Sequence, residues 1–168
     1  MPFLRPIDEY RTIRALLGGA ERLAHEAGEA EPGAEHLLLA ALALSDGTAR
    51  RSFERLGADP DGLPAAIEAQ HVDALQAVGI DPGDAGRVES PAAPAPGPYR
   101  STASAQAAFR RAVELSAVPA PRRLQGAHVV AAVAEMAHGT VPRALRRMGV
   151  DPERLGAAAR QEVPMAPR

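Results

Sequence analysis

The chain has 168 residues, of which 46% are apolar, enough for one compact domain or two small ones with an aliphatic core. It contains no Cys, which excludes a disulfide framework, a thiolate metal site and a cysteine nucleophile. The net charge of −2 is the sum of an acidic part and a basic part. Residues 1–98 carry 16 acids and 8 Arg, whereas residues 99–168 carry 5 acids and 11 Arg. We expect the two parts to attract each other across an internal interface, although a basic surface for an anionic partner would give the same pattern.

The start of the chain, Met1 to Arg5, lacks the basic and apolar regions of a signal peptide. No apolar run approaches the length of a membrane span. We therefore expect a cytoplasmic protein with no membrane partner, and the lack of Cys is compatible with that compartment.

An internal repeat with a constant offset of 92 residues is the most informative feature of the sequence. The matched positions are His36 and His128, Gly47 and Gly139, Thr48 and Thr140, Asp59 and Asp151, Pro60 and Pro152, and Leu63 and Leu155. Apolar positions before them also superimpose, including Leu17 on Phe109. We therefore predict two copies of one structural unit.

Each copy is predicted to contain four helices. In the first copy, apolar residues on one face predict a helix near 10–27. A second helix, short and strongly apolar, follows the break at Pro32-Gly33 and stops near Asp46-Gly47. A third helix near 48–56 ends at Gly57, which can adopt the left-handed C-cap conformation.

The fourth helix of the first copy is expected to open with Asp59 as its N-cap and Pro60 as its first residue. Pro64 is expected to tighten or kink the first turn of this helix. The second copy repeats the plan at about 101–118, 127–138, 140–148 and 152–162.

We therefore predict the all-α class, with two tandem four-helix repeats related by a pseudo-twofold axis and joined by a Pro/Ala-rich linker. The repeats span residues 1–80 and 99–163, the linker is 81–98, and 164–168 form a frayed tail. We expect the two repeats to pack as one domain.

The repeat, the linker and one motif together resemble a known family. The stretch from Gly33 to Leu42, GAEHLLLAAL, is similar to the Gly-Thr-Glu-His-Ile-Leu-Leu-Gly-Leu element of the double N-terminal domain of bacterial Clp ATPases. The resemblance covers nearly the whole chain. It implies a module that recruits substrates and adaptors for an unfoldase, and we expect a free-standing member without ATPase rings. With no Lys in the chain, the phosphate-binding loop of those rings cannot form.

The resemblance also implies a ligand site, because in some relatives the motif Glu of each repeat receives the guanidinium of arginine-phosphorylated substrates. The first repeat keeps Glu35, but Ala127 replaces the acid in the second. A Thr near the start of the first helix corresponds to Tyr10 in one repeat and to Thr102 in the other. Neither repeat keeps both elements, so a different peptide-like or small ligand is favoured over phosphoarginine.

In some relatives the N-terminal segment and the linker border a groove that binds adaptors or cyclic peptide antibiotics. Phe3 and Tyr99 occupy those segments here. The candidate ligand-binding residues are therefore Glu35, Tyr10, Thr102, Phe3 and Tyr99.

The five His residues do not predict a metal site or a catalytic site. His36 and His128 occupy equivalent helix starts, where an imidazole can hydrogen-bond locally, and His25, His71 and His138 lack the spacing of a zinc motif. Glu35 and His36 are adjacent in a helix, where side chains point about 100° apart and do not converge. We expect no metal, no cofactor and no enzymatic activity.

The leading hypothesis is a non-enzymatic module that binds a peptide, an adaptor or another protein partner, with a Clp ATPase or its substrates as candidates. The alternative is sequestration of a small molecule, such as a cyclic peptide antibiotic aimed at Clp N-domains. A third hypothesis, a regulator that touches nucleic acid, has least support because aromatic stacking residues are scarce. It would use the Arg pairs Arg110-Arg111, Arg122-Arg123 and Arg146-Arg147.

Overall fold

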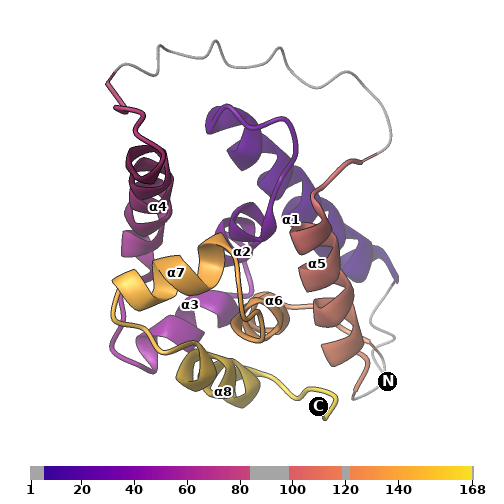
Figure 1. Cartoon of the computed structure of the whole chain (residues 1–168). Helices are drawn as coiled ribbons and strands as arrows, with labels where there is room; N and C mark the ends of the chain where they lie inside the picture. Colours follow the sequence, from indigo (N-terminus) through magenta and orange to yellow (C-terminus); the bar gives the residue numbers. More distant parts are fainter. Residues whose placement is uncertain (1–5, 84–98, 119–121, 168) are drawn as a thin grey trace.

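The regular structure is entirely helical in the computed structural model, which describes residues 6–83, 99–118 and 122–167 (Figure 1). The first half contains α1 (Pro6–Glu26), α2 (Ala34–Leu42), α3 (Thr48–Glu54), the 3-10 turn η1 (Pro60–Gly62) and α4 (Leu63–Ala77). The second half contains α5 (Ala103–Leu115), α6 (Gly126–Ala134), α7 (Thr140–Arg147) and α8 (Pro152–Glu162). No strand occurs in the described ranges, and the predicted all-α class is confirmed. Within the same ranges, no helix combines the length and the apolarity that a bilayer span requires.

The fourth helix of each half begins with the predicted Asp cap. The carboxylate of Asp59 accepts a hydrogen bond from the backbone N–H of Asp61, and that of Asp151 accepts one from Glu153. The two starts then differ, because Pro60 opens a 3-10 turn whereas Pro152 opens α8 directly. The expected tightening at Pro64 explains the difference, since Pro64 has no N–H to donate to the carbonyl of Pro60. The N–H of Leu63 donates to that carbonyl instead.

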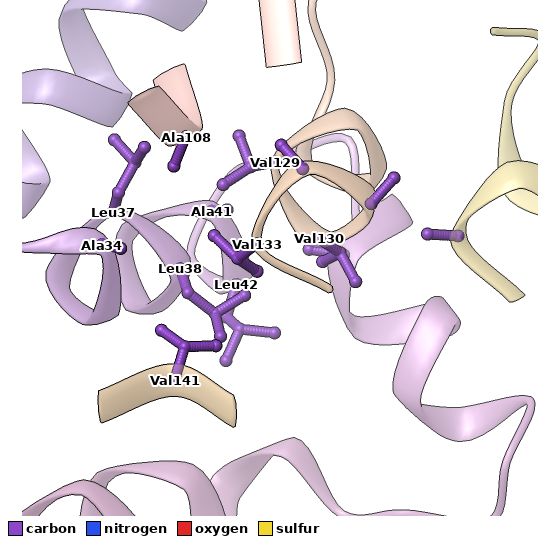
Figure 2. Packing of buried hydrophobic residues seen from close by; sticks show 14 of the residues in the cluster. Ala34, Leu37, Leu38, Ala41, Leu42, Ala108, Val129, Val130, Val133 and Val141 are labelled. Atoms are coloured by element: carbon purple, nitrogen blue, oxygen red, sulfur yellow. The ribbon is translucent and has the colours of Figure 1, made fainter. Parts of the chain in front are cut away.

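Helices α2 and α6 form the centre of the core. All of α2 except Leu39 is buried, and so is α6 from Gly126 to Val133. The two helices pack against each other, with α1 and α5 against α2 and α6 respectively, and with α7 also against both. Figure 2 shows the apolar side chains of the two helices meeting beside Val141 of α7. One hydrophobic cluster therefore contains residues from both halves of the chain.

The two halves interlock through helix pairs and ion pairs. Helix α3 packs on α8, and α4 packs on α7. Arg51 of the first half bonds Glu162 of the second at 2.7 Å, whereas Arg147 of the second half bonds Asp73 of the first at 2.6 Å. Cross-half ion pairs thus run in both directions. The pair of Arg147 and Asp73 is exposed and contributes little, whereas the side chain of Glu162 is only 6% exposed and also pairs with Arg55. The interface depends on the shared apolar core rather than on the charge difference between the halves.

The last residues, expected as a frayed tail, are docked in the described range 164–167. The backbone N–H of Ala166 donates to the carbonyl of Leu115 at 2.9 Å, and Met165 packs against the core. Val163 is also buried, so apolar burial on both sides of Pro164 holds the segment. The predicted linker lies outside the described residues except for residues 81–83, and the domain boundaries stay a prediction.

The equivalent residues His36 and His128 both close the start of a central helix. The Nδ1 atom of His36 accepts a hydrogen bond from the N–H of Gly33, and Nδ1 of His128 accepts one from Gln125, both at 3.0 Å. Each side chain satisfies a backbone donor that a buried helix start would leave without a partner. This is the structural role that the sequence predicted for both residues.

Gly126 permits the close approach of α6 to the first half. A Cβ atom at this position would lie 2.8 Å from Cβ of Ala49 and 3.0 Å from the carbonyl oxygen of Ala41. We predict that Gly126→Ala lowers the free energy of unfolding by about 1–3 kcal/mol, because the overpacked contact must open. Urea unfolding measures the change.

Gly18→Ala is the matched control, since Gly18 lies in the exposed part of α1 and a Cβ there meets no atom within 4 Å. The gain in helix propensity should leave this variant as stable as the parent, or more stable by up to about 1 kcal/mol. Equal destabilisation by both substitutions would show that the approach at Gly126 does not limit the packing.

His128 makes the stability sensitive to mildly acidic pH. Burial lowers the pKa of its imidazole, and the nearby carbonyl of Pro164, the backbone of Gln125 and the charge of Asp46 oppose the shift only in part. Its Nε2 atom has no hydrogen-bond partner among the described residues, which agrees with the dominance of burial.

Because this pKa is lower in the folded chain, the unfolded chain binds more protons once the pH falls below about 6.5. We predict that the contribution of His128 to the free energy of unfolding is constant above that pH and decreases below it. His128→Asn should flatten this dependence, whereas His138→Asn, at an exposed position, should retain it. Urea unfolding at a series of pH values measures the slopes, and equal slopes for the parent and His128→Asn would contradict the assignment.

Candidate functional site

An apolar groove lies between α1 and α5. Both helices pack against α2, and the space left between them has a volume of about 410 Å³. The buried Leu37 of α2 forms the floor of this space. The remaining lining residues are Leu17 of α1, together with Tyr99, Ser101, Ala105, Gln106, Phe109, Arg110 and Val113. We call this feature the α1–α5 groove.

The face of α5 explains how the groove forms. Ala108 and Ala112 are buried and small, so the helix backbone approaches the core closely. Ala105, Phe109 and Val113 are spaced four residues apart and follow one another along the neighbouring face, where they line the groove. Phe109 packs against the hydrophobic core but is only partly buried, because it projects beside the Ala contacts.

Tyr99 supplies a hydroxyl group to the groove. Tyr99 is 38% exposed. The partial burial of its phenol, with a smaller effect from the charge of Glu21, raises the pKa of Tyr99 to about 12. The phenol is therefore neutral at physiological pH and can donate a hydrogen bond to a ligand carbonyl.

The start of α2 holds the largely buried side chain of Glu35. Glu35 is 8% exposed and folds back over Gly33, where a Cβ atom would lie 2.6 Å from both carboxylate oxygens. Glycine at this position therefore leaves room for the acid. Among the described residues, no donor forms a hydrogen bond with the carboxylate of Glu35.

The expectation that Glu35 and His36 do not converge is wrong. Oε1 of Glu35 lies 3.7 Å from Nδ1 of His36, because both side chains bend back toward the start of the helix. Since Nδ1 already accepts the hydrogen bond of Gly33, it presents no proton to the carboxylate. Neither Oε1 of Glu35 nor Nδ1 of His36 donates a hydrogen bond to the other, so the two side chains do not form an acid–base pair.

Glu29 and His71 lie beside Glu35. Oε1 of Glu29 is 3.8 Å from Nε2 of His71, and one ligand atom from each of the three residues lies within 4.8 Å of the others. We call these three residues the acidic cluster. Sequence spacing did not reveal it, because the three side chains come from the α1–α2 turn, from α2 and from α4.

The starts of α6 and α2 are closed by different side chains, since at α2 the N–H of Ala34 donates to Oγ of Ser104 at 3.4 Å. The N–H of Gly126 donates to Oδ2 of Asp46 at 3.1 Å, and the N–H of Ala127 donates to Oγ1 of Thr48 at 2.8 Å. Asp46 also accepts hydrogen bonds from the N–H and the hydroxyl of Thr48. The chain's own carboxylate thus occupies the position at which an anionic ligand would meet this helix.

The other predicted site residues are dispersed. Tyr10 lies on α1 and is 64% exposed, whereas Phe3 lies outside the described residues. Thr102 is the N-cap of α5; its hydroxyl accepts a hydrogen bond from Ala105, and its N–H donates to the carbonyl of Pro32. Thr102 therefore joins the starts of α5 and α2. Of the four predicted site residues that the structure describes, Tyr99 alone lines the groove.

Comparison with known proteins identifies one family. Residues 11–87 match the family described as Clp repeat (R) N-terminal domain, a match that includes the acidic cluster and the groove residues Leu17 and Leu37. No curated protein matches the chain. The second predicted repeat lies beyond the matched residues, and the tandem arrangement stays a prediction. Domains of this family are non-catalytic and mediate protein interactions. Residues 11–87, just under half of the chain, are therefore similar to the Clp repeat N-terminal domain family.

Proposed function

We propose that the protein is a non-enzymatic binding module that recognises an apolar peptide segment of a protein partner in the α1–α5 groove. The observation that carries the proposal is the groove itself, a concave apolar surface with few polar groups in a domain of an interaction family. Its floor, Leu37, belongs to the buried central helix, so the site is largely preformed and loses little entropy on binding.

The groove favours a segment with a few apolar side chains. Phe109, Val113 and Leu17 offer aliphatic and aromatic contacts, while the hydroxyl of Tyr99 can donate to a peptide carbonyl. The amide nitrogen of Gln106 already donates to the carbonyl of Ser101 at 2.8 Å. Arg110 at the same groove adds one positive charge. We infer that the partner presents an exposed apolar stretch, as an adaptor or an unfolded substrate of a Clp ATPase does.

Sequestration of a small molecule is the second candidate, and the volume of the groove favours it. About 410 Å³ lies within the range of about 300–1,000 Å³ that is usual for small-ligand sites. A cyclic peptide would use the same contacts as a linear segment. Nucleic acid receives less support, because Arg111 bonds Glu135 and Glu114 and Arg147 bonds Asp73.

Tyrosine fluorescence can test the groove directly. The chain has no Trp and two Tyr, so Tyr10→Phe leaves Tyr99 as the single emitter. We predict that apolar peptides without Tyr or Trp, taken from an unfolded Clp substrate, change the emission of Tyr99 in a saturable way. Phe109→Ala in the same background should weaken binding by about tenfold, since a partly buried aromatic wall is lost.

Val118→Ala is the matched control, because Val118 is 49% exposed in the same half and does not line the groove. Calorimetric titration with a cyclic peptide that binds Clp N-domains separates the two candidates, since binding of that compound alone would favour sequestration. Peptide binding that is equal in the parent and in Phe109→Ala would refute the proposed site.

A further inference from the structure

We propose that the α1–α5 groove selects an acidic apolar peptide, in which an Asp or Glu side chain follows or precedes the apolar residues, and that Arg110 receives the carboxylate. The inference rests on the proposed function and deepens it, because it names the charge of the segment that the same groove binds. Among the described residues that line the groove, Arg110 carries a positive charge and no residue is acidic. A partner with complementary charge is therefore negative at this point.

The guanidinium of Arg110 is the first argument. It forms no ion pair and no hydrogen bond with any residue that the structure describes. The adjacent Arg111 differs, because Glu135 holds its guanidinium at 2.7 Å and Glu114 holds it at 3.2 Å. Arg110 thus keeps all of its N–H donors for a ligand. A guanidinium with free donors can form paired hydrogen bonds with a carboxylate, which are stronger than hydrogen bonds between neutral groups.

The apolar surroundings of Arg110 are the second argument. Phe109 and Val113 line the same groove from the same helix, α5, so an apolar segment that covers them also removes water from the side of Arg110. A charge that loses water without gaining a partner costs free energy. A neutral segment therefore has to leave the guanidinium in water, whereas a segment with a carboxylate can cover it and pair with it. Partial exclusion of water also strengthens the ion pair.

The end of the groove at Tyr99 has the opposite electrostatic character. Glu21 of α1 lies close enough to Tyr99 to contribute to the raised pKa of its phenol. Tyr99 precedes α5, whereas Arg110 lies about 10 Å along that helix from its first residue, Ala103. A ligand carboxylate is repelled by Glu21 at one end and attracted by Arg110 at the other. We therefore expect the groove to fix the direction of the bound segment.

Peptides that differ only in charge test the inference. Each has blocked termini, the same apolar core without Tyr or Trp, and one Asp, Ser or Lys placed either before or after the core. The emission of Tyr99 in the Tyr10→Phe background reports binding. At low ionic strength, the Asp peptide should bind about fivefold more tightly than the Ser peptide in one of the two placements, and the Lys peptide more weakly. This preference should disappear in about 0.5 M salt, while the Ser peptide keeps its affinity.

Charge reversal at Arg110 assigns the preference to one residue. Arg110→Glu should reverse the order, so that the Lys peptide binds more tightly than the Asp peptide. Arg143→Glu is the matched control, because Arg143 is exposed on α7, lies outside the groove and gives the same change in net charge. This control should keep the order of the parent. Both positions are exposed, so both variants should fold, which circular dichroism verifies.

The outcomes separate the inference from the proposed function. Saturable binding of all the peptides with equal affinity would overturn the inference and leave the proposed function intact, whereas no saturable binding of any peptide would contradict both. An order that persists in Arg110→Glu, or that reverses in Arg143→Glu as well, would overturn the assignment to Arg110. Emission of Tyr99 that changes with protein concentration alone would show that a second copy occupies the groove, which would also overturn the proposal.

Discussion

The packing of α2 against α6 is the constraint on which the rest of the structure depends. Each helix is surrounded by other helices, so almost every side chain it carries must be apolar and its start cannot rely on water. His36 and His128 meet that requirement by accepting a backbone hydrogen bond inside the core. The outer helices then pack around a pair whose ends are already satisfied, which is why both halves share one hydrophobic cluster.

Under the same constraint, the starts of α2 and α6 carry different polar groups. At α6, Asp46 and Thr48 from the α2–α3 connection satisfy the first N–H groups, and Ala127 needs no further partner. At α2, Glu35 adds a carboxylate to a buried position without adding a donor for it. The imbalance lies on one side of the central pair only. The two starts therefore differ in their charged groups: Asp46 is held by hydrogen bonds at α6, whereas Glu35 lies near Glu29 and His71 at α2.

Local chemistry was predictable from the sequence, whereas the sites depended on how distant segments meet. Asp59 and Gly57 signal a helix start and a helix end with their own side chains and backbone freedom, and Gly57 indeed has a φ of 67°. The docked tail and the acidic cluster carry no such signal. His71 lies more than one helix away from Glu35 in the chain, and only the packing of α4 brings it near, so motif spacing could not find it.

The groove and the acidic cluster use different sides of one helix. Leu37 and Glu35 are two residues apart in α2, and two residues turn a helix by about 200°. Leu37 therefore faces the space beside α5, while Glu35 faces α4 and the end of α1, which Figure 1 shows well away from α5. Because α2 is fixed on α6 by close packing, occupation of one side requires no movement of the helix that would disturb the other. The groove and the acidic cluster are therefore separate features of the same central helix.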